Sequence, residues 1–217
     1  MKAVIFDMDG VISDTQKLHS RVESELLAQF GVTLTPQQIT EKYSGVRTKD
    51  FFQELLFGQG HVFDIDELMD RKWQRMKGLA SGQVDAIDGS RELIKTLYDN
   101  GLPLAVASAS NLNYVQSVLD KLNVTKYFKS IISGDMVTNG KPDPEIFLLA
   151  SNKLEIVPEE CLVIEDGISG MEAARKANMF CIGLVPNLNK NYPTNNKVLS
   201  LREITIDYLR DITKNAT

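Results

Sequence analysis

Two closely spaced carboxylate pairs are the residues most suited to chemistry in this chain. Asp7 and Asp9 form the first pair, Glu165 and Asp166 form the second, and a glycine follows each pair directly. Two neighbouring carboxylates can take different tasks, because one can approach phosphorus or a metal while the other handles a proton. The glycine permits a tight turn just after the acids. The pattern therefore favours acid–base or metal-assisted chemistry.

A hydroxyl-bearing turn and a framed lysine lie between the two acid pairs. Ser108, Ala109, Ser110 and Asn111 follow an apolar run. At such a turn, a hydroxyl and free N–H groups can either cradle an anion or cap a helix. Lys141 stands in the segment Gly-Lys-Pro-Asp-Pro, whose prolines restrict the backbone and fix its direction. This segment is not a P-loop, because a proline follows the lysine where Ser or Thr is required.

These features predict a magnesium site if they converge. Asp7, Asp9, Glu165 and Asp166 would then form an oxygen-rich pocket of the kind that holds Mg²⁺ together with waters and a substrate phosphate. A carboxylate nucleophile and a phosphate dianion repel each other, and Mg²⁺ and Lys141 would neutralise that repulsion. We therefore expect a Mg²⁺-dependent enzyme that transfers phosphoryl groups.

The elements that must position these residues alternate between short apolar strands and helices. We expect strands at 3–6, 104–107, 131–132, 162–164 and 181–185, and helices at 91–97, 115–122, 146–154 and 170–177. Apolar runs without alternation are typical of strands that are covered on both faces. The order predicts an α/β fold with a Rossmann-like parallel sheet, and each motif follows a strand at its carboxyl end.

One stretch, from about residue 15 to 81, shows helical patterns and no convincing strand. Thr35 to Gln38 and Asp64 to Glu67 have the spacing of helix-capping boxes. We predict an all-helical cap at 15–81, inserted into a catalytic core made of 1–14 and 82–217. An insertion after the first strand lies where α/β folds bind ligands. The segment 187–197 is expected to be a surface loop before a final helix near 205–212.

Composition excludes several classes of protein. The 217 residues carry a net charge of −5 with no basic cluster, so we expect no nucleic-acid partner. No apolar run reaches the roughly 7–15 residues of a signal peptide or the ~20 of a membrane span. The two cysteines, Cys161 and Cys181, lie at or in apolar runs and are expected to pack in the core. We therefore expect a cytoplasmic protein without a membrane partner.

The four motifs, in this order, resemble those of the haloacid dehalogenase superfamily of phosphotransferases over nearly the whole chain. The resemblance is closest to the branch of sugar phosphatases and β-phosphoglucomutases that carries a small helical cap. It implies that Asp7 attacks phosphorus and forms an aspartyl-phosphate. It also implies that Asp9 first protonates the leaving oxygen and then activates water. We expect a small phosphorylated metabolite, such as a sugar phosphate, as the substrate.

The same resemblance implies roles for the remaining residues. Ser108 and the N–H of Ala109 would hold the phosphate, and Lys141 would steady Asp7 and the phosphoryl oxygens. Mg²⁺ would be bound by the Asp7 side chain, the Asp9 carbonyl and Asp166, with Glu165 close by. The predicted substrate-binding residues are His19, Arg47, Lys49, Ala109, Ser110 and Asn111. A monomer is expected.

The alternative reaction is that of a β-phosphoglucomutase, which returns the phosphoryl group to a sugar. Such mutases resemble H-x-x-A-W early in the cap, whereas Val and Glu stand third and fourth after His19 here. Thr48 stands where they carry a phosphate-binding arginine, and Arg47 instead completes a Gly-x-Arg typical of sugar phosphatases. Asn111 replaces their lysine. These departures favour a phosphatase. A dehalogenase would lack the second acid, Asp9, and a phospho-accepting receiver domain would lack the cap.

Overall fold

A parallel six-stranded sheet forms the centre of the protein. The computed structural model describes residues 1–58, 60, 62–80, 82 and 84–214. Within them the strand order is β3-β2-β1-β4-β5-β6, and every neighbouring pair is parallel. The strands are β1 (Ala3–Phe6), β2 (Leu104–Ser108), β3 (Ser130–Ser133), β4 (Cys161–Glu165), β5 (Phe180–Leu184) and β6 (Asn196–Val198). The predicted Rossmann-like α/β fold is confirmed.

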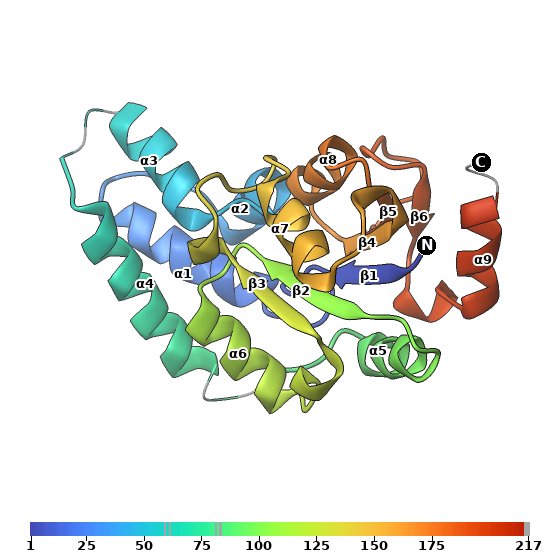
Figure 1. Ribbon diagram of the computed structural model, residues 1–217. Helices are drawn as coiled ribbons and strands as arrows, with labels where there is room; N and C mark the ends of the chain where they lie inside the picture. The colour runs from blue at the N-terminus through green and yellow to red at the C-terminus, as the bar shows by residue number, and fades with distance from the viewer. Residues whose placement is uncertain (59, 61, 81, 83, 215–217) are drawn as a thin grey trace.

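Helices cover both faces of the sheet, which explains the unalternating apolar strands. In Figure 1, α7 (Glu145–Leu154) and α8 (Ile168–Lys176) lie on one side, and α5 (Ser90–Asp99) and α6 (Leu112–Lys121) lie on the other. The C-terminal α9 (Ile206–Lys214) packs into the same apolar core as α5 and α6. Along β1, Ile5 is buried in one core and Phe6 in the other. Short 3₁₀ turns occur at Thr125–Tyr127, Gly134–Met136, Pro158–Glu160 and Leu201–Glu203.

The cap consists of α1 (Gln16–Ala28), α2 (Pro36–Tyr43), α3 (Thr48–Gly58) and α4 (Ile65–Ala80). Figure 1 shows α3 and α4 projecting beyond the edge of the sheet. The predicted capping box at Thr35 is confirmed, since its hydroxyl accepts from the N–H of Gln38 and the Gln38 side chain accepts in return. Asp64 likewise accepts from two backbone N–H groups at the start of α4. The boundaries at 14/15 and 81/82 stay a prediction, and residue 81 lies outside the described residues.

The expected loop at 187–197 is partly wrong, because β6 begins at Asn196. This edge strand has three residues, of which only Val198 is buried, so the sequence has no apolar pattern that would predict a strand there. The Thr194 hydroxyl donates to the Cys181 carbonyl and ties the segment to β5. The two cysteines are buried and unpaired, as expected. Among the described residues, none of the helices has the length and apolarity needed to cross a membrane.

Candidate active site

Asp7 lies directly after the central strand β1, where the carboxyl ends of three strands meet. β1 pairs with β2 on one side and with β4 on the other, so Ser108 and Glu165 end their strands beside it. The backbone N–H of Asp7 donates to the Ile164 carbonyl at 3.0 Å. The Asp7 side chain is buried, as are those of Ser108 and Glu165. The parallel topology therefore brings together acids and a hydroxyl that are far apart in the sequence.

Lys141 joins the two acid pairs. Its Nζ lies 2.6 Å from Oδ1 of Asp7 and 2.7 Å from Oε1 of Glu165, and it also donates to the Ala107 carbonyl at 3.2 Å. The lysine is only 2% exposed. A buried ammonium group is stable only when it is paired and hydrogen-bonded, and here all three contacts come from residues at the carboxyl ends of β1, β2 and β4. Lys141 is therefore held rigidly against Asp7.

Asp7, Glu165 and Asp166 form an acidic cluster whose ligand atoms all lie within 4.8 Å of one another. Burial raises the pKa of Asp7 to about 8; Lys141 opposes this shift, and Glu165 and Asp9 reinforce it. Burial, together with Glu165 and Asp7, also raises the pKa of Asp166 well above its usual range. Oδ1 of Asp166 is buried without a hydrogen-bond partner among the described residues. One lysine thus faces the buried carboxylates of Asp7 and Glu165 and the partly buried carboxylate of Asp166.

This cluster fits a divalent cation that prefers oxygen ligands, because such an ion would supply the missing positive charge. Gly10, with a φ of +95°, lets the loop after β1 approach the cluster, since a Cβ there would lie 2.2 Å from Oδ2 of Asp166. The Asp9 side chain is not part of the cluster. The predicted contribution of the Asp9 carbonyl to the metal site stays a prediction.

The Asp9 carboxylate is held by donors from both the core and the cap. Its Oδ1 accepts from the Thr15 hydroxyl at 2.5 Å and lies 3.2 Å from Nε2 of His19. Its Oδ2 accepts from the hydroxyls of Ser110 at 2.9 Å and Ser108 at 3.3 Å. Burial alone would raise the pKa of Asp9, but the His19 imidazole and the hydroxyl donors outweigh it and lower that pKa to about 2. Asp9 is therefore ionised in this arrangement.

The turn after β2 combines the two uses that its sequence allows. The Ser108 hydroxyl accepts from the Ser110 N–H at 3.1 Å, which folds the turn toward Asp9. Asn111 caps α6, because its side chain accepts from the Tyr114 N–H at 2.9 Å. The Ala109 carbonyl packs against Gly134, where a Cβ would lie 2.4 Å from it. Ser108 and Ser110 therefore face Asp9, whereas the oxygen of Asn111 serves the helix.

His19 connects the cap to this site. It lies on α1 and is buried, with the rings of Trp73 and Tyr114 in edge-to-face contact at 6.0 and 5.2 Å between centroids. These rings come from α4 and α6, so cap and core both fix the imidazole beside Asp9. His19 thus contacts a predicted catalytic residue directly, and its predicted contact with substrate stays untested.

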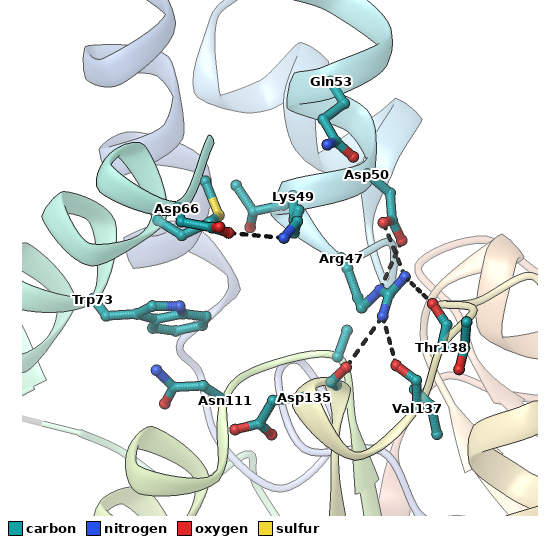
Figure 2. Close-up of a pocket in the computed structure, with 14 residues that line it drawn as sticks. Arg47, Lys49, Asp50, Gln53, Asp66, Trp73, Asn111, Asp135, Val137 and Thr138 are labelled. Atoms are coloured by element: carbon teal, nitrogen blue, oxygen red, sulfur yellow. Dashed lines mark hydrogen bonds and ion pairs between the residues drawn. The ribbon is translucent and has the colours of Figure 1, made fainter. Parts of the chain in front are cut away.

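Arg47 spans the junction between cap and core (Figure 2). Its Nε and Nη2 donate to the two oxygens of Asp50, and Nη2 also donates to the Thr138 carbonyl at 2.9 Å. Nη1 donates to the carbonyls of Val137 at 3.0 Å and Gly134 at 3.2 Å. A guanidinium has five N–H donors, and these contacts use all of them. The predicted substrate-binding role of Arg47 stays a prediction, and the geometry fits a cap–core link better.

Several hollows lie between the described residues of the cap and the core, and two of them share Thr48 and Ala109. A cavity of about 30 Å³ is bordered by Asp7, Asp9, His19 and cap residues of α1, α3 and α4. Beside it lies a cleft of about 580 Å³ that contains Arg47, Lys49 and Asn111 in its walls. Nζ of Lys49 lies 2.8 Å from Oδ1 of the largely exposed Asp66, as Figure 2 shows. Thr48 and Ala109 line both hollows, which are therefore neighbours.

Comparison with known proteins agrees with this geometry. Residues 4–184 match a family model described as haloacid dehalogenase-like hydrolase. The chain belongs to this family. Among curated proteins of known sequence, it is 33% identical over 190 residues to a phosphorylated carbohydrates phosphatase from Thermotoga maritima, covering 87% of this chain and 88% of that protein.

Two further proteins that are similar to this chain are β-phosphoglucomutases. The chain is 31% identical over 191 residues to a β-phosphoglucomutase from Bacillus subtilis, covering 85% of this chain and 83% of that protein. The crystal structure of a β-phosphoglucomutase from Clostridium difficile superposes with a TM-score of 0.86 at 28% identity, over 97% of this chain and 96% of that one. The cap and the core of this haloacid dehalogenase-like chain therefore both follow that architecture.

Sequence reasoning missed several residues of this hydrolase site. Thr15, six residues after Asp9, opens the cap and donates to Asp9, and its position just before the first helical pattern is the only sequence signal for it. Glu23, Thr48 and Lys72 border the small cavity and contact one another. They come from three separate helices, so their spacing in the sequence gives no indication that they meet.

Proposed function

We propose that this protein is a Mg²⁺-dependent phosphatase that hydrolyses small phosphorylated metabolites, namely sugar phosphates, through an aspartyl-phosphate on Asp7. The observation that carries the proposal is the position of Asp7, which belongs to the acidic cluster, contacts Lys141 at 2.6 Å and lines the same cavity as Asp9. Membership of the haloacid dehalogenase-like hydrolases and the similarity to a carbohydrate phosphatase support it.

In the first step, an Asp7 carboxylate oxygen forms a bond to phosphorus while the bond from phosphorus to the ester oxygen breaks. Lys141 keeps Asp7 oriented, and the Ser108 hydroxyl and the Ala109 N–H receive the phosphoryl oxygens. Asp7, Asp166 and the Asp9 carbonyl would hold the Mg²⁺, with Glu165 nearby. The bound ion supplies positive charge against the repulsion between carboxylate and phosphate.

Asp9 handles the proton in both steps. An arriving phosphate dianion raises the pKa of a nearby carboxyl, so Asp9 can take up a proton on substrate binding and give it to the leaving oxygen. The ionised Asp9 then accepts a proton from water as the water attacks the aspartyl-phosphate. Thr15, Ser110 and His19 fix the orientation of its carboxylate. One residue can thus act as acid and then as base.

The mutase reaction is the second candidate, because the chain resembles β-phosphoglucomutases in sequence and in structure. It differs in the acceptor, since a sugar hydroxyl rather than water must take the phosphoryl group. An assay with Mg²⁺ that measures phosphate release from hexose phosphates, run beside isomerisation of β-glucose 1-phosphate primed with β-glucose 1,6-bisphosphate, separates the two. We expect phosphate release. Formation of glucose 6-phosphate with almost no free phosphate would contradict the proposal.

A further inference from the structure

A buried polar trio lies inside the cap where an apolar core would be expected. Glu23, Thr48 and Lys72 come from α1, α3 and α4, and their exposed fractions are 5%, 6% and 1%. Oε1 of Glu23 accepts from the Thr48 hydroxyl at 2.6 Å and from Nζ of Lys72 at 2.8 Å. Lys72 also contacts the Thr48 hydroxyl. A buried ion pair is costly to desolvate, so its presence in a small helical module calls for a reason beyond stability.

The position of the trio supplies that reason, because all three residues border the cavity that contains Asp7 and Asp9. The trio therefore borders the space into which the leaving group of a phosphate ester attacked by Asp7 would extend. The hydrogen bonds from Thr48 and Lys72 both go to Oε1 of Glu23, so neither of them uses Oε2. The volume of about 30 Å³ is close to that of one water, so a larger leaving group extends into the neighbouring cleft.

Each basic side chain in the walls of the two hollows is matched by a carboxylate from the cap. Lys72 is paired with Glu23 at 2.8 Å, Lys49 with Asp66 at 2.8 Å, and Arg47 with Asp50 at 2.8 Å. Asp135 adds a further acid to the wall of the cleft, beside Asn111 in Figure 2. In the walls of these two hollows, the described cap residues thus offer an anion no lysine or arginine without a carboxylate partner.

We infer that the Glu23–Thr48–Lys72 trio selects phosphate monoesters whose leaving group is uncharged and carries hydroxyls, and that it disfavours substrates with a second phosphate. This inference rests on the proposed function, since it concerns the leaving group at the same site. A second phosphate in the cap would be desolvated beside carboxylates with no unmatched cation, which is unfavourable. A polyol instead finds a carboxylate acceptor, a hydroxyl and an ammonium donor at fixed positions.

Binding to a variant without the nucleophile tests the inference independently of turnover. In the Asp7→Asn background with Mg²⁺, calorimetric Kd values are measured for fructose 6-phosphate and fructose 1,6-bisphosphate, with and without Glu23→Gln. The isosteric change removes the charge that neutralises Lys72. We expect the monophosphate to bind more tightly in the parent, and Glu23→Gln to shift the ratio of the two Kd values on the order of tenfold toward the bisphosphate.

Thr48→Val is the matched control, because it removes a hydroxyl of the trio and keeps the Glu23–Lys72 charge pair. Thr48→Val is expected to weaken the binding of both ligands and to leave the ratio of their Kd values unchanged. Tighter binding of the bisphosphate by the parent, or a ratio that Glu23→Gln leaves unchanged, overturns the inference. So does an equal shift of the ratio in Thr48→Val. Failure of the unmodified enzyme to release phosphate from any sugar phosphate would instead contradict the proposed function, which this binding ratio does not measure.

Discussion

Nε2 of His19 lies 3.2 Å from Oδ1 of Asp9, so a side chain of the first cap helix contacts the acid that follows the central strand. The imidazole is enclosed by Trp73 and Tyr114, which fixes its position. The cap therefore does more than cover the site, because the orientation of Asp9 depends on a cap residue.

His19→Asn should affect substrates according to their leaving group. A sugar phosphate needs a proton on the leaving oxygen, whereas the p-nitrophenolate ion leaves without one. Because hydrolysis of the aspartyl-phosphate is common to both substrates, the comparison uses kcat/KM, which reports the first step: we expect kcat/KM for the sugar phosphate to fall on the order of tenfold more than kcat/KM for p-nitrophenyl phosphate. Steady-state kinetics on both substrates measure this, with Trp73→Phe as a control that keeps the His19–Asp9 contact. Equal losses on both substrates would mean that His19 does not position Asp9 for proton transfer.

Arg47→Ala should impair all substrates alike. The guanidinium donates to Asp50 and to the carbonyls of Gly134, Val137 and Thr138, so its loss loosens the cap on the core without removing a ligand contact. We expect similar reductions in kcat/KM for a sugar phosphate and an aryl phosphate. Lys49→Gln, which removes only the pairing with the exposed Asp66, is the matched control and should have a smaller effect. A loss confined to the sugar phosphate would show that Arg47 binds substrate.

The stability contributed by Glu23 should depend on pH. Burial alone would raise the pKa of Glu23, but Lys72, His19 and the Thr48 hydroxyl outweigh it and lower that pKa. A carboxyl whose pKa is lower in the folded state stabilises the fold above its unfolded pKa of about 4.3, and this contribution is lost as the pH falls through the folded value. Urea unfolding should therefore show that the native protein has a larger free energy of unfolding than Glu23→Gln, and that this difference narrows below about pH 4.

Glu25→Gln is the control for that experiment, because Glu25 lies on the same helix in exposed ion pairs with Arg21 and Arg75. Exposed ion pairs contribute little to stability, so the free energy of unfolding of Glu25→Gln should stay close to that of the native protein at every pH measured. If the difference in free energy of unfolding between the native protein and Glu23→Gln does not change with pH, the pKa of the Glu23 carboxyl is not lowered in the folded protein.

The grouping of the candidate catalytic residues at the carboxyl end of the sheet was predictable from the sequence, because the order of the parallel strands determines it. Asp7, Ser108 and Glu165 end adjacent parallel strands, so recognising apolar strands and the acids after them was enough to place them together. The prolines around Lys141 predicted that its side chain points in one fixed direction, and in the structure it contacts Asp7 and Glu165.

The cap was predictable only as a helical unit. The contact between Glu23 and Lys72 joins residues 49 positions apart, and it depends on how α1 packs against α4. Likewise Arg47 reaches carbonyls near residue 138, and backbone acceptors leave no trace in the side-chain sequence. The strand β6 escaped prediction because three residues at the edge of a sheet carry no periodic pattern.

The most direct test of the account is to trap the phosphoryl group on Asp7. Asp9→Asn is mixed with p-nitrophenyl phosphate and Mg²⁺, quenched in acid, and examined by peptide mass spectrometry. Because this leaving group needs no acid while the second step needs a base, we predict a burst of one p-nitrophenol per enzyme and a phosphorylated Asp7. The double variant Asp7→Asn/Asp9→Asn should show neither. No burst and no phosphoryl group on Asp7, or turnover that survives Asp7→Asn, would contradict the assignment of Asp7 as the nucleophile.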